Sequence, residues 1–330
     1  PLTLTSSSHG ASIKSPTEIL FSSSIFRINS LPWGRNGYRA NKDSSPISGE
    51  LIGIGMKTIL PRGFFNTYRP LPLENMSHPQ DPPVLQASQQ SLIDLQDDVR
   101  EYFGWDESDD RDSALKMILR VENMNVERWS RHNRAMTLSR LFRRLVIRKP
   151  KLAILGAAIE PEEILKILTE PILIVAADGA AGVISEISET LAEKAWSRMA
   201  CIVSDADGGE GTIQAVHRAV PVILHAHGDN MHDWDSILKI SECQPNPPEL
   251  VLTHQTSENI PGMHNPGGFT DGDRAACFLT ALGVDKGHIK MLGTRSDLVG
   301  RWSGKTQDQI KIRKLQWMKK FLSIQGLLVD

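Results

Sequence analysis

The first unit of the pattern that decides the fold reads KLAILGAAIEPEEILKILTEPILIVAA and occupies residues 151–177. Two short aliphatic runs flank a segment whose apolar residues recur at helical spacing, which is typical of a strand–helix–strand unit. The alternation continues along the rest of the chain. It predicts strands at 152–157, 172–177, 199–203, 220–226, 250–253 and 288–292. It predicts helices at 162–168, 184–195, 212–218, 233–240, 271–282 and 306–322.

Uniform alternation of strands and helices implies parallel strands joined by right-handed crossovers. We therefore expect an α/β domain over residues 151–330, built as an open, mostly parallel, doubly wound sheet of about six strands with helices on both faces. In such sheets, ligands bind outside the carboxyl ends of the strands. Functional residues should therefore directly follow the strands.

Residues 91–150 carry apolar residues at helical spacing, such as Leu92, Leu95 and Val99, and we expect a small helical segment there. Its last part, residues 128–149, holds eight Lys or Arg and no acidic residue. This amphipathic basic helix is either a solvated face or a contact surface, for phosphates or for a second subunit of a homo-oligomer.

Residues 1–90 hold ten of the 19 prolines, 14 serines and only five acidic residues. Their apolar residues follow neither a strand nor a helix period, so we expect a disordered segment without a core. We interpret it as a leader, or as a non-native extension upstream of a start at Met56 or Met76. Ser-rich, acid-poor leaders also occur as organelle transit peptides, but the run of arginines typical of those is absent from this sequence.

Composition narrows the function classes. The 37 Lys and Arg residues nearly balance the 39 Asp and Glu residues, which argues against a protein that coats nucleic acid through net charge. The longest apolar runs are well short of the roughly 20 residues that span a membrane. The three cysteines lack CxxC spacing and are odd in number, which argues against a disulfide framework or a thiolate zinc site. We expect a cytoplasmic protein that binds neither nucleic acid nor membrane.

Acidic residues and glycines follow successive predicted strands. DGA (178–180) follows the second strand, SDADG (204–208) the third and HGDN (227–230) the fourth, and GGFTDGDR (267–274) leads into a later helix. Carboxylates gathered at one edge repel one another unless a cation neutralises them, or unless they are dispersed helix caps. Mg²⁺ takes carboxylate oxygens and keeps waters for substrate phosphates, and glycines let backbone amides approach a phosphate. The pattern therefore favours a magnesium and phosphate site.

Two common nucleotide motifs, GxxxxGK[ST] and GxGxxG after the first strand, are absent from the sequence, which weighs against a standard dinucleotide enzyme. His225, His227 and Asp229 form an HxHxD run, which is typical of two-metal hydrolases and would suit zinc or manganese. That run is normally reached through β-hairpins rather than βα units. A two-metal hydrolase therefore stays as an alternative.

The chain resembles the archaeal 6-hydroxymethyl-7,8-dihydropterin diphosphokinase family through ADGA (177–180), SDADG (204–208), HAHGDN (225–230) and GGFTDGDRA (267–275). The resemblance covers about residues 90–325. ADGA, the paired aspartates and TDGDRA are also similar to elements of the thiamine pyrophosphokinases, which are taken to share the catalytic fold. HAHGDN favours the pterin family.

The resemblance implies an enzyme that transfers diphosphate from ATP to 6-hydroxymethyl-7,8-dihydropterin, releases AMP and uses Mg²⁺, in the biosynthesis of a pterin cofactor such as tetrahydromethanopterin or folate. Its partners would be ATP and a reduced pterin. The alternatives are a thiamine pyrophosphokinase and a non-catalytic nucleotide-binding or glycosyl-transfer-related module.

The same resemblance implies roles for individual residues, with 151–330 as the catalytic domain. Mg²⁺ would be held by Asp205 and Asp207, with a second cluster of Asp271 and Asp273, and Arg274 would stabilise charge on the transferred group. The nucleotide side would comprise Asp178, Gly179, Ala180, Gly268 and Thr270. The pterin side would comprise His227, Asp229, Asn230 and Gln255.

Overall fold

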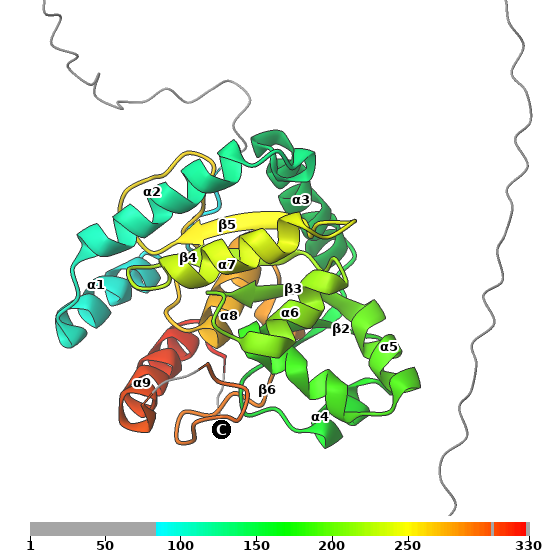
Figure 1. Ribbon diagram of the computed structural model, residues 1–330. Coiled ribbons are helices and arrows are strands. Elements are labelled where there is room, and N and C mark those ends of the chain that lie inside the picture. Colours follow the sequence, from blue (N-terminus) through cyan, green and yellow to red (C-terminus); the bar gives the residue numbers. More distant parts are fainter. Residues whose placement is uncertain (1–83, 305–306, 328–330) are drawn as a thin grey trace, which may run out of the picture. The chain divides into compact units, whose positions relative to one another are not determined.

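The computed structural model describes residues 84–304 and 307–327 (Figure 1). Most of the predicted leader, residues 1–90, lies outside the described residues. One open sheet has the strand order β5-β4-β3-β2-β1-β6, and every neighbouring pair is parallel. Its strands are β1 (Lys151–Leu155), β2 (Ile172–Ala177), β3 (Met199–Ser204), β4 (Val222–Ala226), β5 (Leu250–His254) and β6 (Ile289–Leu292). The predicted α/β sheet is confirmed.

Helices cover both faces of the sheet because neighbouring residues of each strand point their side chains to opposite faces. Ile154 and Leu155, adjacent in β1, belong to different hydrophobic cores. The first core joins the sheet to α4 (Pro161–Ile167), α5 (Glu189–Arg198), α6 (Gly209–His217) and α7 (Met231–Glu242). The second core joins it to α3 (Arg131–Phe142), α8 (Asp271–Leu282) and α9 (Asp308–Ile324).

The direction of strand addition reverses between β1 and β6. Strands β1 to β5 follow one another across the sheet, and the chain then returns through α8 to place β6 on the free side of β1. Leu155 is level with Ala176 of β2 and with Leu292 of β6, so these three strands end at the same height. A ligand crevice is expected at the carboxyl ends where such a reversal occurs.

The predicted helical segment is confirmed, and it packs onto the sheet. It consists of α1 (Ser91–Phe103), α2 (Glu107–Asn123), a 3-10 turn η1 (Glu127–Trp129) and α3, which continues into a π-helical turn η2 (Arg143–Ile147). Ala114 and Met117 of α2 belong to the first core, and the indole N–H of Trp129 donates to the carbonyl of Pro248 at 2.8 Å. The helical segment and the sheet therefore share one interior.

The predicted helices differ from the observed ones by a few residues at their ends, and the largest difference is in the helix predicted at 184–195. Residues predicted as its start form a 3-10 segment, η3 (Asp178–Glu186), and α5 begins only at Glu189. Segment η3 packs so closely on α6 that a Cβ on Gly211 would lie 2.5 Å from the carbonyl oxygen of Gly179, so only glycine fits there. A further 3-10 turn, η4 (Lys286–His288), precedes β6. Within the described part of the chain, no helix combines the length and apolar character needed to cross a bilayer.

Candidate active site

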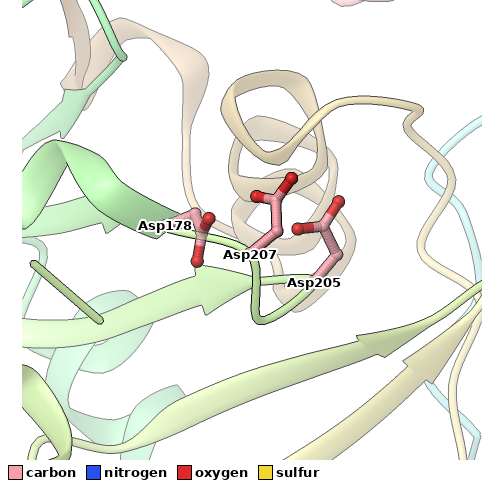
Figure 2. A group of neighbouring side chains, drawn as sticks. All are labelled: Asp178, Asp205 and Asp207. Carbon is pink, nitrogen blue, oxygen red and sulfur yellow. The ribbon is translucent and has the colours of Figure 1, made fainter. Parts of the chain in front are cut away.

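Three carboxylates meet at the ends of β2 and β3 (Figure 2). Asp178 directly follows β2, and Asp205 and Asp207 lie in the loop after β3. Each offers an oxygen within 4.8 Å of the others. Among the described residues, these three aspartates form the one cluster of Asp, Glu, His or Cys side chains that is close enough to share a metal ion. We call them the aspartate triad.

The triad sits on a strained backbone. Asp178 has φ 45° and Ala206, between the two other aspartates, has φ 80°, a region that costs free energy for residues with a Cβ. Side chains hold this geometry: the Ser204 hydroxyl contacts Asp178 Oδ1 and accepts from the amide of Ala206 at 2.9 Å, and the Thr212 hydroxyl donates to the same Asp178 oxygen at 2.8 Å. Backbone strain of this kind is found where function fixes the positions of side chains.

The two loops touch through their backbones. A Cβ on Gly208 would lie 2.2 Å from the amide nitrogen of Gly179 and 2.3 Å from Asp178 Oδ2. Gly179 lies in this contact, and both Gly179 and Ala180, which were predicted on the nucleotide side, are buried.

Burial and the neighbouring charges shift the pKa values of the triad. Burial, and then the negative charges of Asp271, Asp205 and Asp207, raise the pKa of Asp178 well above its usual value. Burial and the charge of Asp205 also raise the pKa of Asp207. Burial alone would raise the pKa of Asp205, but His227 and Arg274 hold it well below its usual value.

The donor set fits a hard divalent cation. Asp205 Oδ1 is buried, and it has no hydrogen-bond partner among the described residues. Three carboxylates that cannot all ionise without a counter-charge, one of them with an unpaired buried oxygen, match the all-oxygen ligands that Mg²⁺ prefers. Magnesium usually takes only one or two protein carboxylates and keeps several waters. The triad is therefore sufficient to hold one ion.

Arg274 links the triad to the start of α8. Its Nη1 donates to Asp205 Oδ2 and to Asp271 Oδ1, at 3.2 Å each, and Nη2 donates to Gln255 Oε1 at 3.3 Å. Burial and the charge of Asp205 raise the pKa of Asp271 to about 7. The structure thus brings Asp271, Arg274 and Gln255 to the triad, as the sequence predicts.

His227 lies on the other side of Asp205. Its Nε2 is 3.2 Å from Asp205 Oδ2 and its Nδ1 is 2.8 Å from Asp229 Oδ1. Burial would lower the pKa of His227, but the hydrogen bonds to both carboxylates raise it to about 9. The hydrogen bond from His227 in turn lowers the pKa of Asp229 to about 2. At neutral pH this ring is therefore a cation that donates to two carboxylates.

Three predicted site residues have structural partners instead. Both carboxylate oxygens of Asp273 accept hydrogen bonds from Phe269 and Thr270 at the start of α8, in a capping box. The Asn230 amide bonds the backbones of Asp205, His225 and His227, so it shapes the loop. Asp273, predicted to bind metal, and Asn230, predicted to bind substrate, are therefore not free for those roles.

The third of these residues is Gly268, which was predicted on the nucleotide side. It has φ 95°, its carbonyl accepts from Gln96 at 2.9 Å, and a Cβ there would lie 2.7 Å from Arg274 Cα. Gly268 allows close packing behind Arg274.

His225, the first member of the HxHxD run, is also buried, and its ring nitrogens lie 3.0 Å from Thr253 Oγ1 and 3.3 Å from Gln255 Oε1. This arrangement leaves it outside the triad and removes the main support for a two-metal hydrolase.

Two cavities meet at the triad. The β1–β6 crevice is a narrow cleft at the strand reversal, lined by Gly156–Ala158, Gly293–Arg295, Trp302, Asp178 and Asp207. The aromatic cavity has a volume of about 290 Å³ and is lined by Trp105, Phe269, Asp109, Asp205, His227 and Lys314. Thr270, Asp271 and Lys311 line both. The site can therefore hold two ligands whose reacting groups meet beside the aspartates.

Several residues of these cavities were not found from the sequence. Lys311 and Lys314 of α9 line the aromatic cavity, and burial lowers the pKa of Lys314. Their spacing of three residues places them on one side of the helix, which is the signal that could have found them.

Comparison with known proteins identifies three archaeal relatives, and no family model matches the chain. A protein of Methanothermobacter thermautotrophicus is 32% identical over 166 residues, which cover 47% of this chain and 63% of the relative. A protein of Pyrococcus furiosus is 32% identical over 39% of this chain and 48% of the relative. A protein of Methanocaldococcus jannaschii is 31% identical over 37% of this chain and 53% of the relative.

All three relatives carry the name 6-hydroxymethyl-7,8-dihydropterin pyrophosphokinase, a synonym of diphosphokinase. The resemblance predicted from the four motifs is thereby confirmed. The chain spans less than two thirds of the length of each relative that it matches.

Proposed function

We propose that this chain is an enzyme that transfers the diphosphoryl group of ATP to the hydroxymethyl oxygen of 6-hydroxymethyl-7,8-dihydropterin and releases AMP. The observation that carries the proposal is the junction of two cavities at the aspartate triad, with Asp271 in the wall of both. A bisubstrate transfer needs such a junction because the acceptor oxygen must approach phosphorus in line. The names of the three relatives supply the acceptor.

In this proposal, Asp178, Asp205 and Asp207 hold Mg²⁺, with Asp271 beside them. When bound, Mg²⁺ would neutralise the phosphate oxygens of ATP and the triad together. Burial and the neighbouring carboxylates raise the pKa values of Asp178 and Asp207, and a bound cation would favour the ionised forms that act as ligands. The fit rests on the buried, unpaired Asp205 Oδ1 and the closeness of the three side chains.

We place the nucleotide in the β1–β6 crevice. Glycine-rich turns after β1 and β6 border it, and Thr270 and the N-terminus of α8 lie at its inner end. Backbone amides at a helix N-terminus favour anionic groups. The acceptor then occupies the aromatic cavity, where Asp205, His227 and Arg274 face it.

The reaction forms one bond and breaks one. The hydroxymethyl oxygen bonds to the β-phosphorus of ATP, the bond from that phosphorus to the oxygen bridging the α- and β-phosphates breaks, and AMP leaves with that oxygen. The hydroxyl proton must move to a base. We assign this role to Asp271, because it lines both cavities, whereas Asp229 and His227 are paired with each other.

Arg274 and Lys311 provide positive charge for the phosphates in addition to the metal ion. The guanidinium is fixed by Asp205, Asp271 and Gln255, so it lies beside the triad before any ligand binds. Donors fixed in advance stabilise developing charge without reorganising during the reaction. Lys311 lines both cavities and can contact a phosphate that crosses from one to the other.

The test is an assay of the purified protein with ATP and Mg²⁺, offering the reduced pterin and thiamine in parallel. The proposal predicts AMP and the pterin diphosphate in equal amounts, no thiamine diphosphate, and no product after chelation of divalent ions. If only thiamine gave a product, thiamine rather than the pterin would be the acceptor. Nucleotide binding without any turnover would instead favour the non-catalytic module.

A further inference from the structure

Two aromatic side chains, Trp105 and Phe269, line the aromatic cavity. The Trp105 indole stacks on Phe103, with ring centroids 4.6 Å apart and an interplanar angle of 14°, and Phe269 lies 6.0 Å from both rings. Trp105 is nevertheless 42% exposed and, with Phe269, borders the cavity. Aromatic surfaces held in place by such packing accept another ring at little cost in conformational entropy.

Most carboxylates around this cavity already have partners. Asp205 and Asp271 bond Arg274, and Asp229 bonds His227. Asp110 accepts from Arg100, Gln255 and the amide of Gly228, and Asp106 caps the first turn of α2 by accepting from Ser108. The residual acidic group on the wall is Asp109, whose carboxylate has no hydrogen bond or ion pair among the described residues.

Asp109 is exposed and packs against the loop after β4. It lies in the first turn of α2, and its Cβ is 3.0 Å from the position that a Cβ on Gly228 would occupy, next to His227. The α2 turn is therefore packed directly on the loop that carries His227 and Asp229. A carboxylate at this point can accept two hydrogen bonds from a ligand without disturbing the neighbouring ion pairs.

We infer that Asp109 determines the choice of acceptor by binding the aminopyrimidinone edge of the pterin ring, while Trp105 and Phe269 contact the ring. The inference rests on the proposed function. That edge presents two adjacent donors, the ring N3–H and the 2-amino group, which match the two oxygens of one carboxylate as a guanidinium does. The aminopyrimidine of thiamine places ring-nitrogen acceptors beside its amino group, so it cannot form the same pair with Asp109.

A structural role for Asp109 has to be separated from this one. An acidic residue in the first turn of a helix also stabilises the helix through its dipole. Asp112, one turn further along α2, is exposed and pairs only weakly with Lys116, at 4.0 Å. Asp112→Asn removes the same charge from the same helix outside the cavity and is the matched control.

The test compares wild type, Asp109→Asn and Asp112→Asn with two acceptors: the reduced pterin, and the matching lumazine, in which the 2-amino group is replaced by oxygen. Loss of a charge-assisted pair predicts that Asp109→Asn raises KM for the pterin about 10- to 100-fold. KM for ATP should stay within about twofold, since that site is unchanged. The asparagine amide can donate to the 2-oxo group and accept from N3–H, so Asp109→Asn should prefer the lumazine, whereas the other two proteins should prefer the pterin.

Two results would overturn the inference while the proposed function stands: Asp109→Asn behaving like Asp112→Asn, or Asp109→Asn losing activity equally with both acceptors. Wild type that turns over neither acceptor would reject the proposed function, and this inference with it. Circular dichroism and thermal melting confirm that the three proteins are equally folded.

Discussion

The guanidinium of Arg274 lies 3.2 Å from a carboxylate oxygen of Asp205, which precedes it by 69 residues in the chain. Both side chains are largely buried, and the same guanidinium nitrogen is 3.2 Å from Asp271. One arginine thus pairs with Asp205 of the triad and with Asp271 beside it. A side chain that cannot make all of these hydrogen bonds should lower both the stability and the activity.

Arg274→Lys keeps the charge but cannot reach Asp205, Asp271 and Gln255 together. We expect a loss of roughly 1–3 kcal/mol in the free energy of unfolding, and kcat at least about tenfold lower, because buried carboxylates lose charge-assisted hydrogen bonds. Urea denaturation and steady-state kinetics measure the two effects. Arg313→Lys, at an exposed position of α9, is the control and should change neither. Equal behaviour of the two variants would contradict the role given to Arg274.

The contribution of Asp271 to stability without metal should fall as pH rises. Burial and the charge of Asp205 raise the pKa of Asp271 to about 7 from its ordinary value of 3.8, so between these pH values this group binds more protons in the folded state than in the unfolded state. This contribution is therefore fully present in acid and is lost as pH rises toward 7. Mg²⁺ should raise Tm more at pH 8 than at pH 5, since it binds the ionised carboxylates. A Mg²⁺-induced shift in Tm that is independent of pH would contradict the account.

Asp273 and Asp207 should separate folding from metal binding. Asp273→Ala removes the capping box of α8 and should cost about 1–2 kcal/mol of stability, with the Mg²⁺ affinity of the folded protein unchanged. Asp207→Asn should weaken Mg²⁺ binding at least about tenfold and leave the metal-free protein as stable as wild type or more so, because it relieves repulsion within the triad. Calorimetric titration and thermal melting report the two properties. If Asp273→Ala instead weakened Mg²⁺ binding and Asp207→Asn did not, Asp273 rather than Asp207 would be a metal ligand.

Lys311 should act on both substrates. Lys311→Met removes the cation shared by the two cavities and should lower kcat/KM about 10- to 100-fold, since a charge-assisted contact to phosphate is lost. Lys319→Met, on the exposed side of the same helix, serves as the control. An unchanged kcat/KM for Lys311→Met would show that α9 only covers the sheet.

The sheet and the triad could be predicted from sequence because both follow from local pattern. The run at residues 172–177 is aliphatic throughout and bounded by turn residues, and it coincides with β2. Parallel strands end at one edge, so the acids that follow β2 and β3 had to come together. No assumption about distant contacts was needed for these two features.

The wall of the aromatic cavity that holds Trp105 and Asp109 could not be predicted in this way. Trp105 and Asp109 reach the cavity only because α2 packs on α7 and the adjoining strands, a contact between segments more than 100 residues apart that leaves no local signal. Asp271 and Asp273, two residues apart, are equally acidic in the sequence, and the Thr270 cap decides which of them faces the triad. The polar side of α9 gives no indication of whether solvent or a cavity lies beside it.

In the proposed reaction, the aspartate triad holds the metal ion that binds the ATP phosphates. The most direct measurement is the anomalous diffraction of Mn²⁺ in a crystal grown with the α,β-methylene analogue of ATP, which cannot be cleaved at the reacting bond. We expect the Mn²⁺ peak at coordination distance from carboxylate oxygens of the triad, with the analogue's phosphates bound to the same ion. A peak elsewhere, or a nucleotide bound away from the junction of the two cavities, would contradict the account.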